Sequence, residues 1–323
     1  MGRLFSIGEV LIDFIPMQKG KALKDVQSFK RAPGGAPANV AAAVARFGAE
    51  SAMITKLGMD AFSDFLIEEL QKIGVKTDKI KRTNEANTGL AFVSLRDDGE
   101  RDFSFYRNPS ADLLLSEDEI EESWFAKGDI LHFCSVDLVE SPMKKAHEKA
   151  IRLVKENGGI ISFDPNVRLP LWNSAEKCRQ TILEFIPKAH IIKISDEELA
   201  FITGITNEKE AIENLFTGDV KAVIYTKGAN GADLYTKNAK YESTGFKVEV
   251  QDTTGAGDAF IGGFLYKLLE KEVNHDNLID VLNEHHQEIL TFANASGAIT
   301  TTGKGAISSL PTKEEILNFI SCK

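Results

Sequence analysis

The sequence turns from a polar loop into an apolar segment at Asp252-Thr253-Thr254-Gly255-Ala256-Gly257-Asp258. The following residues, 259–269, are apolar nearly all round and predict a helix buried at the centre of the protein. The first N–H groups of a helix have no partner inside it, and with the helix dipole they form a site for an anion such as phosphate. Gly255 and Gly257 leave the backbone open to such a ligand. From this stretch alone, Asp258 is either a helix cap or a group that meets the reacting atoms.

A second glycine-rich stretch, Gly34-Gly35-Ala36-Pro37-Ala38-Asn39, precedes a run of alanines. The proline suits a first helical turn, so we expect a helix over residues 37–47. Asn39 projects from that turn, where its amide either binds sugar hydroxyls or is satisfied locally. The alanines here, and Gly262 and Gly263 in the later helix, predict close helix packing.

Elsewhere, short β-rich runs alternate with segments of helical periodicity, which predicts an α/β protein with a mostly parallel sheet covered by helices. Strands are expected at residues 4–14, 51–57, 130–134, 160–164, 191–194 and 222–226. Further helices are expected at residues 61–73, 142–156, 175–186 and 196–203. No repeat or linker composition marks a boundary, so we expect a single domain over residues 1–323.

Two segments break this alternation. Residues 88–94 and 101–106 are β-rich and flank Asp97-Asp98-Gly99-Glu100, which is a strong hairpin signal. We expect a small accessory sheet from residues 14–32 and 88–108 that acts as a lid over a ligand and excludes water from it. A decorative hairpin is the alternative, and exposed strand edges would also support a homodimer through the lid.

The composition excludes several classes of protein. With 43% hydrophobic and 27% charged residues, the chain has the make-up of an ordinary soluble protein. Its 38 basic and 48 acidic residues leave a net charge of −10, which disfavours binding to nucleic acid or anionic membranes. Three cysteines without CxxC spacing suggest neither a disulfide framework nor a zinc site, and His285 and His286 lack a spaced ligand partner. Without a signal-like start or a long apolar run, a cytoplasmic protein is expected.

Together, residues 34–41 and 252–260 resemble the two signature regions of the ribokinase-like (PfkB) carbohydrate kinases, in that family's order and spacing. The resemblance extends from Gly8-Glu9-Val10-Leu11-Ile12-Asp13 to Gly303-Lys304-Gly305-Ala306. Within the family it is to bacterial fructokinases, carried by residues 33–41, 105–112 and 163–172. It implies a three-layer α/β/α sandwich with a β-sheet lid. The implied reaction transfers the γ-phosphate of ATP to the 6-hydroxyl of D-fructose, with Mg²⁺ and a monovalent cation such as K⁺.

The resemblance also implies roles for single residues. Asp258 would take the proton from the acceptor hydroxyl, while the turn of Gly255, Ala256 and Gly257 holds the transferring phosphate. The helix dipole predicts that Asp258 stays ionised and is a weak base. The sugar would be bound by Asp13, Gly34, Gly35 and Asn39, with Asp13 at the end of the first strand. Arg107 and Arg168 would reach the substrate or its phosphates, or else form surface ion pairs.

For the nucleotide and its ions, the resemblance points to a further set of residues. Around ATP these are Lys193, Thr226, Lys227, Gly228, Gly231 and Asn294. Lys193 interrupts an apolar strand, and a buried cation needs a partner. Glu198 matches the family glutamate that organises Mg²⁺ through water, although Ser195 replaces the usual asparagine and Ser-x-x-Glu is also a capping box. Asp252 and Thr254 match the monovalent-cation position.

Other functions would require residues or motifs that can be looked for in this sequence. The glycine stretches lack the GxGxxG spacing of dinucleotide-binding enzymes and the GxxxxGK[ST] motif of P-loop kinases. Ketodeoxygluconate, an acid, would call for an unpaired cation such as Arg107 or Arg168. A riboside would use an aromatic surface such as Phe103, Phe105 or Tyr106. A non-catalytic, sugar-binding regulatory relative would be expected to have lost Asp258 or an anion-site glycine, and both are present.

Overall fold

The computed structural model describes residues 2–18, 20–95 and 101–322, and its largest element is a nine-stranded sheet. In spatial order the strands are β13 (Lys240–Ser243), β12 (Ala232–Thr236), β11 (Ala222–Thr226), β10 (Ile191–Ser195), β9 (Ile160–Asp164), β8 (Ile130–Cys134), β1 (Leu4–Ile7), β4 (Ser51–Gly58) and β5 (Ile80–Thr83). Strands β5 to β11 in this order run parallel, whereas β12 is antiparallel to both β11 and β13. The predicted mostly parallel sheet is therefore confirmed.

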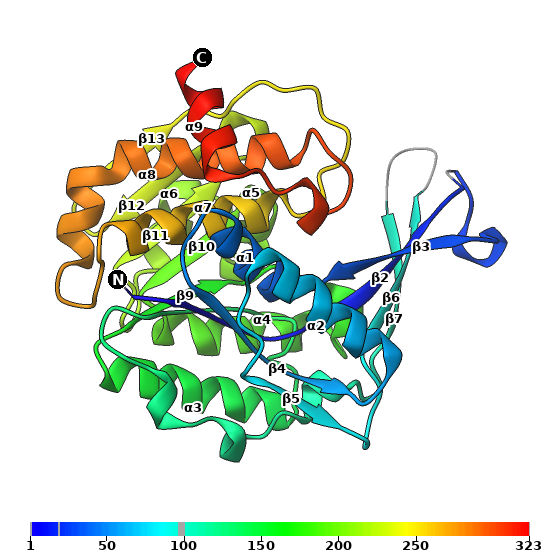
Figure 1. The fold of residues 1–323 in the computed structure, drawn as a ribbon. Helices are drawn as coiled ribbons and strands as arrows, with labels where there is room; N and C mark the ends of the chain where they lie inside the picture. The colour runs from blue at the N-terminus through cyan, green and yellow to red at the C-terminus, as the bar shows by residue number, and fades with distance from the viewer. Residues whose placement is uncertain (1, 19, 96–100, 323) are drawn as a thin grey trace.

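Helices cover both faces of this sheet (Figure 1). One layer contains α1 (Ala36–Arg46), α2 (Ala61–Ile73), α7 (Ala256–Glu270), α8 (Leu278–Thr300) and α9 (Lys313–Ser321). The other contains α3 (Pro142–Glu156), α4 (Ala175–Phe185), α5 (Asp196–Thr203) and α6 (Glu208–Asn214). Successive strand residues point to opposite faces, so Leu4 packs into the first layer and Phe5 into the second. Among the described helices, none has the length and apolar character needed to span a bilayer.

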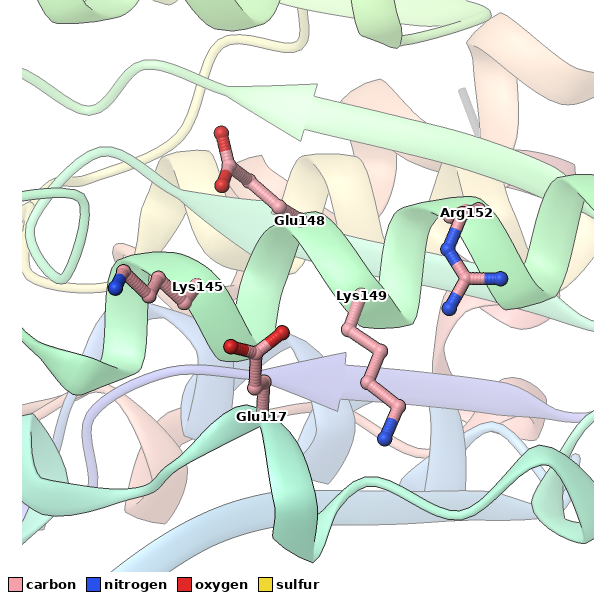
Figure 2. Close-up of a pocket in the computed structure, with 5 residues that line it drawn as sticks. All are labelled: Glu117, Lys145, Glu148, Lys149 and Arg152. Carbon is pink, nitrogen blue, oxygen red and sulfur yellow. The ribbon is translucent and has the colours of Figure 1, made fainter.

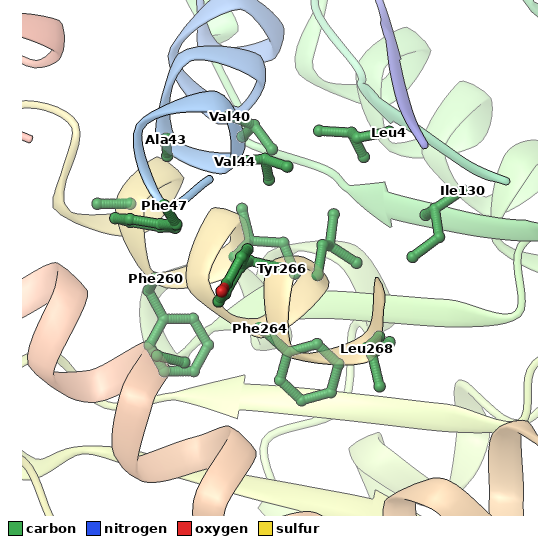
Figure 3. Close-up of a cluster of buried hydrophobic side chains, with 14 of the residues drawn as sticks. Leu4, Val40, Ala43, Val44, Phe47, Ile130, Phe260, Phe264, Tyr266 and Leu268 are labelled. Carbon is green, nitrogen blue, oxygen red and sulfur yellow. The ribbon is translucent and has the colours of Figure 1, made fainter. Parts of the chain in front are cut away.

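Helix α7 lies at the centre of the first layer, as its apolar sequence predicts. Figure 3 shows Phe260, Phe264 and Leu268 of α7 among side chains of α1 and the sheet. A Cβ built on Gly262 would lie 2.6 Å from the Cβ of Ala43 in α1, and one on Gly263 would lie 2.7 Å from Ser296 Oγ in α8. The two glycines thus allow the predicted close packing of α7 against both neighbours.

A second, four-stranded sheet stands off the main one (Figure 1). Its strands, in order, are β3 (Phe29–Gly34), β2 (Leu11–Pro16), β6 (Leu90–Leu95) and β7 (Arg101–Tyr106). The two hairpins β2–β3 and β6–β7 are joined by a parallel pairing of β2 with β6. Phe14 and Phe92 stack across that pairing with ring centroids 4.7 Å apart. The predicted turn at residues 97–100 lies outside the described residues.

The prediction of one strand over residues 4–14 is wrong. Strand β1 ends at Ile7, and the chain bends at Gly8, which has a φ of +145° and would place a Cβ 2.6 Å from Pro37 Cγ. The next strand, β2, belongs to the small sheet. Asp13 consequently lies inside β2, opposite Ala32 and Ala91, and not at the end of a main-sheet strand as expected.

Candidate active site

Helix α7 begins at the glycine turn that the sequence singles out. Gly255 has a left-handed φ of +77°, and a Cβ on it would lie 2.5 Å from the Cβ of Ala306. A Cβ on Gly257 would instead lie 3.3 Å from Lys193 Nζ. Gly255 is therefore required by backbone conformation and packing, while Gly257 places an exposed stretch of backbone next to a buried ammonium group.

Asp258 lies buried in the first turn of α7 and contacts a second helix. Its Oδ2 accepts a hydrogen bond of 2.8 Å from Asn39 Nδ2 in the first turn of α1. Burial raises the pKa of Asp258, although the hydrogen bond from Asn39 and the charges of Lys193 and Arg168 oppose the shift. The expectation of a weak base is wrong in direction, because desolvation outweighs the groups that favour the charged form. That Asp258 stays ionised remains a prediction.

Lys193 has the buried partner that its place in an apolar strand requires. Its Nζ lies 2.9 Å from Oδ2 of Asp164, the last residue of β9. Burial raises the pKa of Asp164 to about 6 despite the nearby ammonium. Burial alone would lower the pKa of Lys193, but Asp164 and Glu198 raise it above its ordinary value, so the amine stays charged. Sequence reasoning missed Asp164, although a carboxylate that ends an apolar parallel strand is a recognisable signal.

Glu198 forms the capping box that its sequence also allows. Its Oε2 accepts hydrogen bonds from Ser195 N at 3.0 Å and from Ser195 Oγ at 2.9 Å. Its Oε1 accepts from Val167 N at 2.7 Å. Burial alone would raise the pKa of Glu198, but Lys193 and these hydrogen bonds lower it, so the group remains a carboxylate. No cluster of three or more metal-ligating side chains occurs in the part of the chain that the structure describes.

Asp252 ties the loop before α7 to the segment after α8. Its Oδ1 accepts hydrogen bonds from Thr254 N at 3.0 Å and Thr254 Oγ1 at 2.6 Å. Its Oδ2 accepts from Gly305 N at 3.0 Å. These bonds fix the loop that carries the glycine turn, and the cation-binding role of Asp252 and Thr254 stays a prediction.

The first glycine stretch brings the small sheet against α1. A Cβ on Gly34 would lie 2.2 Å from Asp13 Oδ2, so the carboxylate lies directly over that backbone. Gly35 has a φ of +108°, and a Cβ there would lie 2.4 Å from the carbonyl oxygen of Glu9. The pair of glycines therefore places Asp13 of the small sheet near the start of the helix that carries Asn39.

The two predicted arginines differ sharply in their surroundings. Arg107 is buried and forms ion pairs with Asp112 and Asp137, and its Nε donates to Ser110 Oγ at 3.2 Å. It is therefore not a surface ion pair and does not offer an unpaired charge. Arg168 is exposed, and its Nη1 donates to the carbonyl oxygen of Val167 at 2.9 Å.

The nucleotide-site predictions cluster at the end of β11 and on α8. Thr226 ends β11, and the turn that follows holds Gly228 and Gly231 with φ of +53° and +93°. Lys227 Nζ lies 2.6 Å from Asp233 Oδ1, a partner that sequence reasoning did not identify. Asn294 of α8 donates to Ser243 Oγ at 3.0 Å. Strand β11 pairs with β10, so this turn lies next to the strand that carries Lys193.

A surface hollow along α3 lies away from these residues (Figure 2). Its lining consists of Glu117, Lys145, Glu148, Lys149 and Arg152. Arg152 pairs with Glu156 at 3.0 Å and Glu148 with Lys188 at 3.0 Å, as expected for a solvated, mixed-charge helix face. None of the predicted site residues lines it.

Comparison with known proteins gives matches over nearly the whole chain. The model of the pfkB family carbohydrate kinases matches residues 1–313. The probable fructokinase-4 of Arabidopsis thaliana is 44% identical over 318 residues, which cover 98% of this chain and 96% of that protein. A crystal structure of fructokinase from Xylella fastidiosa with bound ATP has a TM-score of 0.91 at 36% identity and covers 99% of this chain and 98% of its own.

A fructokinase double mutant from Vibrio cholerae O395, bound to fructose, ADP and potassium ion, has a TM-score of 0.87 at 35% identity, covering 99% of this chain and 98% of its own. The architecture found here, a mostly parallel sheet between two helical layers with a small accessory sheet, is thus shared with solved kinases. With a family match over most of its length, the chain belongs to the pfkB family of carbohydrate kinases.

Proposed function

We propose that this protein is an ATP-dependent fructokinase, which transfers the γ-phosphate of ATP to the 6-hydroxyl of D-fructose. The observation that carries the proposal is the buried Asp258, which lies beside the Gly255–Gly257 turn, accepts a hydrogen bond from Asn39 and is near Lys193. In this proposal Asp258 is the base, the glycine turn is the anion site and Lys193 is a fixed cation beside them. Relatives with 44% identity or with a TM-score of 0.91 are named fructokinases, which supports fructose as the acceptor.

The chemistry follows from the charges at this site. Asp258 takes the proton of the acceptor hydroxyl, and its raised pKa makes it a stronger base than an exposed aspartate. In this proposal the N–H groups of Gly255, Ala256 and Gly257 stabilise the charge on the transferring phosphoryl group. The Ala256 N–H, which donates to the carbonyl oxygen of Thr253 at 3.3 Å, would exchange that bond for the phosphate. The transition state of phosphoryl transfer is loose, so positioning and charge stabilisation contribute more than early proton removal.

The residues proposed to bind the acceptor favour a neutral hexose. Asp13, Asn39 and the backbone at Gly34 and Gly35 supply acceptors, donors and room for close approach to hydroxyl groups. Arg107 is already paired with two carboxylates, so it does not supply the free cation that ketodeoxygluconate would need. Arg168 is exposed and, as proposed, reaches the phosphates or the sugar.

The remaining alternative is a riboside, the acceptor of other kinases with this fold. Tyr106, at the end of β7, offers an aromatic face for its base. Its ring packs edge-on against Phe92 with centroids 5.3 Å apart, within the aromatic cluster of the lid. Phe105 also has an interaction partner, whereas the side chain of Phe103 lies outside what the structure describes. A single exposed ring is a weaker indication of a riboside than the hydrogen-bonding groups around Asp13 and Asn39 are of fructose.

We further propose that ATP lies along the edge formed by the ends of β10 and β11 and the start of α7. Its contacts would come from Lys193, Thr226, Lys227, Gly228, Gly231, Gly255, Gly257 and Asn294. Mg²⁺ suits a site without a protein cage, since it is held mainly by phosphate oxygens and water and neutralises their charge. Glu198, a carboxylate near Lys193, would hold one such water, and the loop of Asp252 and Thr254 would hold K⁺.

An assay of ADP release with fructose, ketodeoxygluconate, ribose, adenosine and aminoimidazole riboside tests the proposal. We expect the highest kcat/KM for fructose, because a buried hydroxyl-reading group left unpaired by the wrong sugar costs about 10⁴-fold. A higher value for another acceptor would refute the fructokinase assignment and leave the kinase chemistry standing. Sugar binding without the formation of ADP, whichever acceptor is offered, would instead indicate a regulatory relative.

A further inference from the structure

We propose that Glu9 is a positioning residue for Asp258. Glu9 fixes the first turn of α1, and through that turn it fixes Asn39, which holds Asp258. The inference deepens the proposed function, since it takes Asp258 as the base of a sugar kinase. Glu9 stands at the junction where the chain leaves the main sheet after β1 and enters the small sheet at β2.

The first contact joins Glu9 to α1. The Glu9 side chain is buried, with 3% of the residue exposed, and its Oε1 accepts a hydrogen bond of 2.9 Å from the N–H of Ala36. Ala36 is the first residue of α1, where an N–H group has no partner inside the helix. Glu9 therefore satisfies one of the first-turn N–H groups of a helix whose N-cap residue, Gly35, has no side chain.

Other contacts fix the same turn against the same junction. Ser6 Oγ donates to the carbonyl oxygen of Pro37 at 2.7 Å, and Gly8 packs directly on the Pro37 ring. The N–H of Asn39 donates to the carbonyl oxygen of Gly35 at 2.9 Å, which closes the first turn. The side-chain Nδ2 of Asn39 then donates to Asp258 Oδ2 at 2.8 Å. A displacement of the first turn would therefore move the donor that holds the base.

The far side of Glu9 faces the cluster at the base of the lid. The charged groups there are Arg107, Asp112 and Asp137, and Arg107 follows β7 directly. The second carboxyl oxygen of Glu9, Oε2, is buried and has no hydrogen-bond partner among the described residues. Only one oxygen of Glu9 is thus engaged with α1, so a neutral amide at this position can make the same bond.

The test is a mutant cycle of Glu9→Ala, Asn39→Ala and the double mutant, with Glu9→Gln as the conservative variant. The acceptor is whichever sugar the wild type phosphorylates best. We expect Glu9→Ala to lower kcat about tenfold, since small displacements of catalytic groups are costly, and Glu9→Gln to stay within about threefold of wild type. The double mutant should lose no more activity than Asn39→Ala alone.

The pH profile of kcat/KM separates positioning from a merely structural role. The Asn39 hydrogen bond lowers the pKa of Asp258, so its misalignment should move the acid limb to higher pH in Glu9→Ala. The other groups that interact with Asp258, namely Lys193, Arg168, Asp164 and Cys134, are unchanged in this variant.

The control is Asp129→Ala. It removes another buried carboxylate that accepts backbone N–H groups, from Arg3 and Ala126 at 2.9 Å each, away from the site. It should lower stability and leave the acid limb in place. Additive losses in the double mutant, or an unmoved acid limb in Glu9→Ala, would overturn the role of Glu9. Failure of the fructokinase assignment would appear separately, in the choice of acceptor.

Discussion

Asp258 is subject to opposing influences on its basicity. Burial favours the neutral acid, while the donor Asn39 and the cations Lys193 and Arg168 favour the carboxylate. The balance leaves a raised pKa, so as the proposed base Asp258 is stronger than an exposed aspartate and keeps the groups that orient it. Activity that depends on the carboxylate should fall as the pH falls through this raised value.

Replacing Asp258 by Asn should keep the fold and ATP binding and lower kcat by about 10²–10⁴-fold, the usual loss when a general base is removed. Steady-state kinetics and ATP titration of the purified variant measure both quantities. The matched control is Asp118→Asn, which changes an exposed aspartate in the short helical turn Glu117–Glu119, away from the proposed site. Retention of more than half of the wild-type turnover would make Asp258 only a helix cap.

The buried carboxyl group of Asp137 should make the free energy of unfolding depend on pH. Burial raises its pKa to about 7 although Arg107 opposes the shift, so between about pH 4 and 7 the folded state binds the extra proton. The stability contributed by this proton is present below the ordinary aspartate pKa and is lost as the pH rises through 7.

Asp137→Asn cannot titrate. Its free energy of unfolding relative to wild type should therefore increase from pH 5 to pH 8, by on the order of 1 kcal/mol. Urea unfolding at each pH measures the difference, with Asp118→Asn as the control variant. A constant difference across this range would show that Asp137 does not hold the proton.

For single residues, the sequence indicated the chemical group at each position but not which other residue it contacts. The buried Lys193 within an apolar strand required a partner. Asp164 was a recognisable candidate at the end of its strand, but only strand order shows that the two become neighbours. For Arg107 the sequence suggested a substrate contact or a surface ion pair, whereas the side chain is buried and paired with Asp112 and Asp137. Glu9 was missed because its partner is a backbone N–H, and a backbone donor leaves no trace in residue type.

Among the elements, the closest helix contact gives a packing prediction. Gly262→Ala places a methyl group 2.6 Å from the Cβ of Ala43, so it should cost about 1–3 kcal/mol of stability through overpacking. Thermal and urea unfolding measure the loss. The double mutant Gly262→Ala/Ala43→Gly should be more stable than the sum of the single changes. Strict additivity would mean that α1 and α7 move apart freely.

The small sheet gives a prediction about ligand response. Asp13 of β2 lies against Gly34, where the sugar is proposed to bind, so fructose should increase hydrogen-exchange protection in residues 14–18, 20–32, 88–95 and 101–108. The β12–β13 hairpin at the far edge of the main sheet is the internal control. Equal exchange with and without fructose would remove the role as a lid.

Most element positions followed from periodicity, since a buried parallel strand and an amphipathic helix have distinct patterns. Helix α2, for example, was predicted over its observed range. The exception is the run at residues 4–14, which is apolar enough for a single strand. The bend at Gly8 depends on contact with Pro37, nearly thirty positions away, and no local pattern records such a contact.

For the molecule as a whole, we propose a homodimer formed through the lid. Strands β3 and β7 are the edges of the small sheet, and Met17 and Tyr106, which directly follow β2 and end β7, are 65% and 63% exposed. Sedimentation should give twice the 35.5 kDa chain mass, and Met17→Asp should shift it toward the monomer. Met59→Asp changes a methionine of matched exposure, 61%, on the main body and should stay dimeric. A wild type that sediments only as a monomer would exclude the dimer.

The parallel pairing of β2 with β6 also bears on the order in which the molecule assembles. Ile12 lies opposite Leu90, and α1, β4, α2 and β5 all intervene along the chain. A lone β2–β3 hairpin is marginal in water, and closing so long a loop costs entropy before any stacking of Phe14 on Phe92 repays it. The small sheet should therefore consolidate late in folding, after the framework beneath it, so a nascent chain exposes the aromatic residues of β2 and β3 until β6 emerges.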